Sequence, residues 1–543
     1  MRGNRSELRR TLATLLTVAA LSAGGAAQVT WNVPGDLPTI QGAIAAASDG
    51  DSIEIEPGTY PEALESLGKS LTIVGLGGAA ATIVDATGQG TSVLRLVSPT
   101  GFGNVHVQGL TLTGGVGTSG PAPGEFPRGG GVFIDGGLHE LRECVIRGNS
   151  AHGGGGAWGG YPGTLLLQDC EVAFNTATDG GGASGGTLLR CHVHHNTATS
   201  RGGGLAFVEA AQDCLIEANE AQFGGGAYSS APSLSGCVFR GNHASIHGGG
   251  LMDQDTESLA GLRFEGNTAA NFGGGAFVVA GSAFDGLTVD RCVFAGNSAA
   301  VADGLYMQAP TLLLAPFETS RCTLVGDQLY NGSPGATLGV RSSILRGLSE
   351  PIHSTLQQVS YSNVEGGVPG PGNIDADPLF VDEAGGDFAL HPGSPCINTG
   401  DPSLPPDADG SVADMGAIPF HPWLDLGGGI AGTAGLPELS GAGPLMGGQP
   451  MSVSLAGAPP LQPTTLVAGL NALGVPFKGG TLWPAPDMLI DGVTAGGAGS
   501  WTLGATWPAG IPSGFSFVMQ VWFPDAGAAQ GFAASNGLRA TTP

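Results

Sequence analysis

The chain is poor in lysine and in charge of any kind. Only 12% of its 543 residues are charged, and its two lysines are Lys69 and Lys478. Acidic residues outnumber basic ones by 45 to 19, which gives a net charge of −26. Because so acidic a surface repels nucleic acid and anionic membranes, we expect neither as a partner. Any basic role falls to arginine, which is a poor proton acceptor at neutral pH.

The chain also lacks a repeated helical period, which disfavours helical and leucine-rich solenoids. Residues 1–27 combine several arginines with a short apolar run and end in small residues, the pattern of a secretory signal peptide. Its removal leaves 15 basic and 44 acidic residues, a net charge of −29. We therefore predict a protein that is secreted or held at the cell surface, with no transmembrane segment in the mature chain.

Glycine is abundant instead, with 98 residues, and the region from residue 144 to about 305 repeats itself. Each repeat reads apolar anchor, four residues, Asn, one residue, Ala, a short spacer and a glycine run. The asparagines are Asn149, Asn175, Asn196, Asn219, Asn242, Asn267 and Asn297. They are 21 to 30 residues apart. A period of this length indicates a solenoid, because one such unit cannot bury its apolar face alone.

The stretch between each anchor and its asparagine alternates with a period of two. Cys237 and Phe239 point one way and Val238 and Arg240 the other, which predicts a short strand with one buried face. Equivalent strands of successive turns would stack in parallel, so we predict a parallel β-helix. Residues 50–365 at about 23 per coil would give roughly 13 to 14 coils. A short amphipathic helix at 39–47 would cover the open end of the first coil.

Two resemblances support this architecture. Phe239–Asn242, Phe264–Asn267 and Phe294–Asn297 match the FxxN motif of polymorphic outer-membrane protein repeats, and Gly-Gly-Ala at 181–183, 225–227 and 274–276 matches their GGA motif. Those proteins are surface adhesins. Segments 33–44 and 50–60 resemble the opening of pectin-lyase-like β-helices, which implies a right-handed coil.

We predict an all-β chain, in which a right-handed parallel β-helix is followed by a small antiparallel β-sandwich. The expected parts are a signal peptide at 1–27, the β-helix with cap helix and closing tail at 28–422, a glycine-rich linker at 423–448, and the sandwich at 449–543. The linker would be open to proteases. The sandwich resembles a C-terminal module of secreted and surface proteins of bacteria, which implies a sorting or attachment role.

Two columns of the repeat admit more than one interpretation. The anchor is cysteine in six of the seven repeats and Leu262 in the other. We favour a ladder of free, buried thiols, because stacked side chains with parallel Cα–Cβ vectors suit disulfide geometry poorly. One or more disulfide bonds are the alternative. The asparagine column is interpreted as a structural ladder, with a row of ligand-binding side chains as its alternative.

A candidate site for chemistry is the acidic segment with Asp253, Asp255 and Glu257, beside Arg240 and Arg263. In an extended strand the three acids would share one face. They could bind Ca²⁺ while the arginines hold a uronate. The alternative is a solvated loop at the edge of a coil.

A second candidate is a metal site formed by Asp401, Asp407, Asp409 and Asp414. The Asp-x-Asp-Gly turn offers hard oxygen ligands for Ca²⁺, but an ordinary aspartate-rich turn is the other interpretation. Residues 182–186 match G-x-S-x-G without the strand–turn–helix elbow that this motif requires, so we attribute the match to chance.

For function, we predict a secreted or cell-surface, adhesin-like structural protein that binds glycan or an extracellular matrix. A polysaccharide lyase or glycoside hydrolase is the alternative, since related folds host such enzymes. The signatures of polygalacturonase-like hydrolases are absent from the sequence.

Overall fold

The computed structural model describes residues 28–98, 103–119, 125–160, 165–229, 233–281, 286–309, 316–348, 350–355 and 357–543. The predicted signal peptide lies outside these residues. The chain divides into two compact units, one of Met1–Gln222 with Gly226–Ser233, the other of Phe223–Gly225 with Leu234–Pro543.

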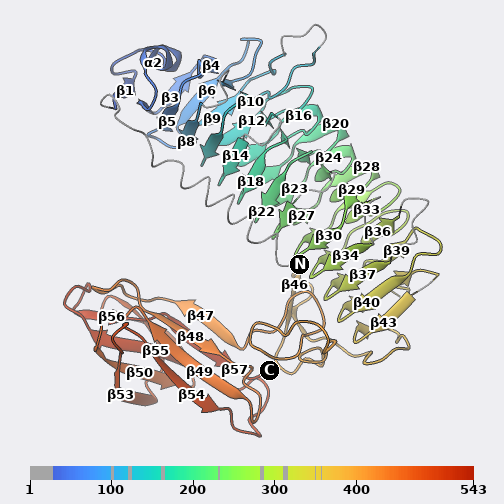
Figure 1. Cartoon of the computed structure of the whole chain (residues 1–543), viewed down its shortest axis with the longest axis vertical. Helices are drawn as coiled ribbons and strands as arrows, with labels where there is room; N and C mark the ends of the chain where they lie inside the picture. The colour runs from blue at the N-terminus through green and yellow to red at the C-terminus, as the bar shows by residue number, and fades with distance from the viewer. Residues whose placement is uncertain are drawn as a thin grey trace. The chain divides into compact units, whose positions relative to one another are not determined.

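The first unit consists of parallel strands stacked in three long sheets, named A, B and C here (Figure 1). Sheet A runs in the order β1 (Thr30–Val33), β2 (Ser52–Ile55), β5 (Leu71–Gly75), β8 (Val105–Gln108), β11 (His139–Arg142), β14 (Leu165–Gln168), β18 (Thr187–Leu189) and β22 (Ala210–Gln212). Sheet B runs β3 (Gly58–Tyr60), β6 (Thr82–Asp85), β9 (Thr111–Thr113), β12 (Val145–Arg147), β15 (Glu171–Ala173), β19 (His192–His194) and β23 (Leu215–Glu217). Sheet C runs β4 (Leu64–Glu65), β7 (Leu94–Val97), β10 (Val132–Asp135), β13 (Ala157–Trp158), β17 (Ala183–Ser184), β21 (Leu205–Ala206) and β25 (Ala227–Ser229). A short fourth sheet, D, contains β16 (Thr176–Asp179) and β20 (Thr197–Arg201), and its strand β24 (Glu220–Phe223) ends where the unit changes.

The second unit contains further coils of the same kind. Strands in the sheet B position are β27 (Val238–Arg240), β31 (Arg263–Glu265), β35 (Val293–Ala295), β38 (Thr323–Val325), β41 (Ile344–Arg346) and β44 (Asn363–Val364). Those in the sheet C position are β29 (Leu251–Thr256), β33 (Ala276–Ala280), β36 (Leu305–Gln308), β39 (Leu329–Asn331) and β42 (Ile352–His353). A further parallel sheet comprises β30 (Ser258–Ala260), β34 (Leu287–Asp290), β37 (Phe317–Ser320), β40 (Leu338–Arg341) and β43 (Gln357–Ser360). Two further strands are β28 (His243–His247) and β32 (Thr268–Ala269), and β26 (Ser233–Ser235) lies at the unit boundary.

Each coil buries one face of every strand, as the alternation predicts. In the first unit Ile146, Val172 and Val193 occupy paired positions of β12, β15 and β19, and all are fully buried. In the second unit Phe239, Phe264 and Phe294 take the same place and stack with centroids 5.0 and 4.9 Å apart. The sheet B position has seven strands in the first unit and six in the second, which fits the predicted number of coils.

The asparagine column is a structural ladder, as predicted. The side-chain oxygen of Asn196 accepts hydrogen bonds from both the backbone N–H and the side-chain amide of Asn175, each at 3.0 Å, and Asn196 itself donates to Val172 O at 2.8 Å. The asparagines of the repeat are all buried. The ladder has an eighth member that the asparagine pattern misses, because Asp327 takes the next position and accepts from the Asn297 backbone N–H at 2.9 Å.

The cysteine column contains free thiols. None of the eight cysteines forms a disulfide bond and all are buried, which excludes the disulfide alternative in this structure. Each thiol does more than pack: Cys191 Sγ donates to Leu167 O at 3.3 Å, and Cys214 Sγ accepts from the Cys191 backbone N–H at 3.4 Å. Ser343 takes over this role farther along, since its hydroxyl accepts from the Cys322 backbone N–H at 3.1 Å.

The predicted cap is helix α2 (Ile40–Ala46), which buries Ile40, Ala43 and Ile44 and packs against β1, β2 and β4. Its two ends are capped from the first coils. The Glu62 carboxylate accepts from the first backbone N–H groups of the helix, both at 2.9 Å, and Lys69 Nζ donates to three carbonyls at its end. One of the two lysines of the chain thus terminates this helix.

A closing tail follows the last coil and contains the antiparallel pair β45 (Phe380–Asp382) and β46 (Asp387–Leu390).

The C-terminal part is antiparallel. Its six-stranded sheet contains β47 (Trp423–Gly427), β57 (Gly537–Thr541), β55 (Ser516–Pro524), β50 (Pro463–Gly469) and β53 (Met488–Thr494), with β56 (Phe532–Ala534) beside β55. The other strands are β48 (Glu438–Ala442), β49 (Pro450–Ala456) and β54 (Trp501–Thr506) in one sheet, and β51 (Ala472–Phe477) with β52 (Gly480–Pro484) in another. Leu439, Leu455, Trp501 and Val521 come from two of these sheets and share one core, as in a β-sandwich.

The glycine-rich segment 423–448 is not a linker, so that prediction is wrong. Strand β47 pairs with β57 at the end of the chain, and β48 pairs with β49. Two of its glycines make room for large rings: a Cβ on Gly441 would lie 2.0 Å from the ring of Trp423, and one on Gly428 would lie 2.6 Å from Nε1 of Trp483. At these two positions glycine is required by the close packing of a tryptophan ring.

Candidate functional site

The predicted acidic site does not assemble. Asp253 is fully buried on β29, in register with the buried Val278 of β33. Asp255 lies at a break in that register, with a φ of 75°, and it is exposed, as is Glu257. The three acids therefore do not share a face, because the irregularity at Asp255 interrupts the alternation that the prediction assumed.

The two arginines expected beside these acids lie on a different sheet and bind another acid. Arg240 on β27 and Arg263 on β31 both form ion pairs with Glu265, and Arg263 also donates to Gly386 O in the closing tail at 2.9 Å. Their guanidinium groups thus support the coil surface and the tail.

The predicted calcium ligands are turn-forming residues. Asp414 is buried and accepts from the backbone N–H groups of Asn398 and Phe420 at 2.6 and 2.7 Å. Asp407 accepts from the Asp414 N–H at 2.7 Å, and burial raises the pKa of Asp414 to about 7. Asp401 and Asp409 accept from N–H groups two residues farther on. These carboxylates are directed at the backbone of the tail, and the described residues contain no group of three or more His, Cys, Asp or Glu side chains that could hold a metal ion.

A groove that the sequence analysis did not identify lies on the outer side of sheet C in the first unit. The outward positions of consecutive strands there are Phe133, Trp158, Ser184, Ala206 and Tyr228, in one continuous register. Two small residues thus interrupt a column of large rings. The missing side-chain volume leaves a hollow beside Trp158, because the backbone of each coil is fixed by its neighbours.

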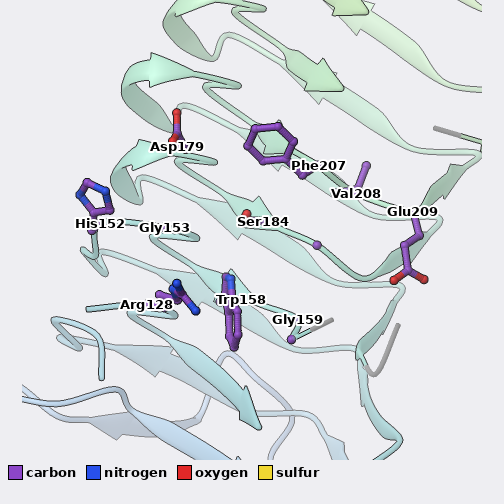
Figure 2. Close-up of a pocket in the computed structure, with 12 residues that line it drawn as sticks. Arg128, His152, Gly153, Trp158, Gly159, Asp179, Ser184, Phe207, Val208 and Glu209 are labelled. Atoms are coloured by element: carbon purple, nitrogen blue, oxygen red, sulfur yellow. The ribbon is translucent and has the colours of Figure 1, made fainter. Parts of the chain in front are cut away.

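The groove has a volume of about 760 Å³ and is open to solvent. It is lined by Arg128, His152, Gly153, Trp158, Gly159, Gly160, Asp179, Ser184, Gly185, Phe207, Val208 and Glu209. These residues come from four consecutive coils, so the groove runs along the stack for roughly 15 Å, three strand spacings of about 4.8 Å. Figure 2 shows Arg128 and Trp158 side by side, with His152 and Glu209 on opposite sides of the groove.

Aromatic rings and arginines are paired at both ends of the groove. The Arg128 guanidinium lies over the Trp158 ring, 4.9 Å from its centroid, and Phe133 stacks on Trp158 at 5.3 Å. Phe207 leaves 41% of its surface exposed and meets Tyr228 edge-on at 5.5 Å. The Phe207 ring therefore offers open apolar surface, whereas Trp158 holds a cation in place.

Three further ionisable side chains line the groove. Asp179 lies 3.7 Å from Arg201, whose guanidinium is also 5.6 Å from the Phe207 ring. His152 stacks on Phe126 at 4.1 Å, and its Nδ1 is 3.1 Å from the Thr178 hydroxyl. Glu209 is exposed at the far side. The groove thus combines apolar ring surface with hydrogen-bonding and charged groups, which is typical of sites for polar ligands.

Ser184 of the G-x-S-x-G match lies in this groove, yet it is not a nucleophile elbow. It belongs to the two-residue strand β17 within the parallel stack, and 8% of its surface is exposed. Strand β18 follows it after two glycines, where the motif would require a helix, so the interpretation of the motif as a chance match agrees with the local structure. Its functional contribution is its small size, which opens the hollow.

A signal for the groove was present in the sequence. The outward position directly follows each Gly-Gly-Ala or Gly-Gly-Leu triplet, as in Trp158, Ser184 and Ala206. In the second unit the same column reads Phe277, Tyr306, Tyr330 and His353 without a small residue, and these rings stack continuously with centroids 4.4 to 5.2 Å apart.

No helix among the described residues is long and apolar enough to cross a membrane. A search of curated proteins finds no match to the chain. The family model of a right-handed beta helix region matches residues 130–312, a range that contains every residue lining the groove except Arg128. The chain is therefore a right-handed parallel β-helix followed by antiparallel sheets, and the groove lies on the β-helix.

Proposed function

We propose that the protein is a secreted or cell-surface, adhesin-like protein that binds glycan in the groove on sheet C. The observation that carries the proposal is the groove itself, whose lining combines the exposed Phe207 ring with the charged Arg128, Asp179 and Glu209. Sugar rings have apolar C–H faces and a polar rim of hydroxyl groups. A site that offers an aromatic face together with ionic hydrogen-bonding groups matches both.

The shape of the groove also favours a chain-like ligand. It is open and crosses four coils, so a polysaccharide could lie along the stack and continue past both ends. Because the coil backbones are held by ladders of buried side chains, the groove is formed before the ligand arrives. Preorganisation of this kind lowers the ordering cost of binding.

The alternative is a polysaccharide-cleaving enzyme, and the groove contains groups that could transfer protons. Asp179, Glu209 and His152 line it. However, Asp179 is next to Arg201, and Glu209 lies on the other side of the groove from His152 in Figure 2. We favour binding over catalysis because the ion pair with Arg201 keeps the Asp179 carboxylate from acting as one of the two catalytic carboxylates that glycoside hydrolysis requires.

The proposal is tested by measuring the binding of the full chain to a glycan panel, together with two variants. Phe207→Ala should weaken binding about tenfold by removing the exposed ring. Phe174→Ala is the matched control, because Phe174 is also exposed, with a similar φ of 56° against 52°, but does not line the groove. Equal binding by both variants would contradict the proposal, and the release of new saccharide ends at catalytic rates would replace binding by enzymatic turnover.

We further propose that the C-terminal sandwich attaches the protein to the cell or matrix. It exposes apolar side chains near its sheet edge, among them Leu470, Phe477, Met488 and Leu489. Exposed apolar surface of this kind is typical of interaction sites. Substitution of Met488 and Leu489 by serine should leave the module folded and release the protein from the cell fraction; retention in the cell fraction would contradict this role.

A further inference from the structure

We propose that the groove recognises a single acidic group of the glycan at Arg128, and that the sugars next to that group are neutral. This inference rests on the proposed function and names its ligand class. The acidic group is a carboxylate or a sulfate, which a guanidinium binds with the same fork of N–H donors. The preferred ligand is thus a heteropolysaccharide in which acidic and neutral sugars alternate.

Arg128 differs from most other arginines of the described residues. Nine of them lie within 4.0 Å of a carboxylate, namely Arg95, Arg142, Arg190, Arg201, Arg240, Arg263, Arg291, Arg321 and Arg341. Among the described residues no carboxylate lies at this distance from Arg128, although acidic side chains outnumber basic ones more than twofold along the chain. An exposed cation without an acidic partner, in so acidic a protein, is available to an anion from outside.

Trp158 holds the Arg128 guanidinium in place. The ring lies 4.9 Å from the guanidinium carbon, and the ring itself is fixed by Phe133 on the preceding strand. A guanidinium over an aromatic face keeps its N–H groups at the periphery free to donate. Because the side chain is already ordered, little rotamer entropy is lost when an anion binds.

The rest of the groove disfavours a second acidic group. Asp179 is balanced by Arg201 at 3.7 Å, so this pair adds no net positive charge. Glu209 contributes a negative charge on the side opposite His152 (Figure 2). A ligand with an acid on every sugar would place like charge against Glu209, and the resulting repulsion counts against it. One acid at Arg128 with neutral neighbours satisfies both parts of the groove.

The test compares the affinity of the full chain for four oligosaccharides of equal length. Hyaluronan oligosaccharide has a carboxylate on every second sugar, κ-carrageenan oligosaccharide a sulfate on every second sugar, oligogalacturonate an acid on every sugar, and cello-oligosaccharide none. We expect one of the two alternating ligands to bind about tenfold more tightly than either of the last two. The better of the alternating ligands identifies the acid as carboxylate or sulfate.

Variants assign the preference to the groove. Arg128→Gln should remove the tenfold advantage of the alternating ligand and leave cello-oligosaccharide binding unchanged. Arg147→Gln is the control, since Arg147 is exposed, has no carboxylate within 4.0 Å among the described residues and lies outside the groove. Glu209→Gln should raise the affinity for oligogalacturonate several-fold. Arg128 is exposed and its backbone hydrogen bonds to Thr118 do not involve the side chain, so Arg128→Gln should unfold at the wild-type temperature.

Two outcomes separate this inference from the proposed function. If the wild type binds glycans but prefers oligogalacturonate, or if Arg128→Gln behaves like Arg147→Gln, the inference is overturned and the glycan-binding function stands. If the wild type binds none of the four ligands and no member of the wider panel, both are overturned.

Discussion

The coils of the β-helix and the C-terminal sandwich use glycine for opposite purposes. In the coils, glycine runs let one backbone pass close to the next: a Cβ on Gly182 would lie 2.6 Å from the Gly204 carbonyl oxygen of the following coil. In the sandwich, glycine makes room for a side chain, as where the Trp423 ring lies against Gly441. The glycines of the coils recur once per coil, so the sequence reveals them. The glycines of the sandwich depend on which aromatic ring, far away in the sequence, packs against them.

The same contrast holds for polar groups. Inside the coils a buried amide is satisfied by its copy in the next coil, so one residue type recurs at one position. In the sandwich the buried Gln520 has three unlike partners: it accepts from the backbone N–H of Trp483 at 3.1 Å and donates to the carbonyls of Thr481 and Ser535. Local disturbances should therefore spread along the ladder in the coils and stay within the module in the sandwich.

The largest effect is expected in the ladder. Asn267→Leu removes a side chain whose oxygen accepts two hydrogen bonds from Asn242 and whose amide donates to Phe239 O at 2.9 Å. Several buried polar groups lose their partners, so we expect a loss of about 4 kcal/mol in the free energy of unfolding. Hydrogen exchange should rise in the coils and remain unchanged in residues 423–543.

The exposed Asn271 provides the control, because Asn271→Leu removes no ladder bond and should change stability little. If exchange increases equally in the sandwich, the two regions do not differ in the way described.

The reverse disturbance is Gly441→Leu. The new side chain would collide with the Trp423 ring, and we expect a loss of about 3 kcal/mol confined to the sandwich. Gly497→Ala is the control, since nothing lies within 4 Å of a Cβ at that position. Hydrogen exchange resolved by peptide should show faster exchange in residues 423–543 alone; a stable Gly441→Leu protein would support the linker that the sequence suggested.

Asp327 sharpens the account of the ladder through its pH dependence. Burial raises its pKa from 3.8 to about 7, so the folded protein keeps it neutral while the unfolded chain ionises it near pH 4. Its stabilising contribution is full below pH 4 and is lost as the pH rises to 7. Asp327→Asn, which restores the neutral amide of the column, should add on the order of 2 kcal/mol at pH 8 and almost nothing at pH 4.

Chemical denaturation of the wild type and the Asp327→Asn variant at the two pH values measures this difference. An equal effect at pH 4 and pH 8 would mean that Asp327 is not neutral in the folded state.

The smallest effect concerns the thiol column. Cys191→Ala removes both the packing of sulfur and the hydrogen bond to Leu167 O, at a cost of about 1 kcal/mol. Cys191→Ser should cost less, because Ser343 and Ser362 already perform the same bonding in later coils. Thermal unfolding ranks the two variants. If alanine is tolerated better than serine, the column acts by packing alone.

Much of the β-helix could be predicted because each coil has the same residue types at the same positions. The asparagine column, the thiol column and the cap helix were all visible as spacing. Asp327 was missed because the pattern was defined by asparagine, although Cys322 stands five residues before it, as an anchor should. A pattern defined by the anchor would have found the eighth member of the ladder.

The candidate site was not predicted, for a physical reason. Asp253 and Asp255 formed a conspicuous acidic motif, but one is buried and the other lies at an irregularity of the strand. The groove instead arises because the small side chains of Ser184 and Ala206 stand where the rest of the column has large rings. Arg128 and Glu209, two charged residues that line it, are 81 positions apart in the sequence. They belong to one site only because the coils stack.

The most direct test of the account is a hydrogen-exchange footprint of the full chain bound to the oligosaccharide of highest affinity. We predict protection in the segments around Arg128, His152 to Gly160, Asp179 to Gly185 and Phe207 to Glu209, and no change in residues 423–543. Protection confined to other coils or to the sandwich, with the groove unchanged, would contradict the assignment of glycan binding to this groove.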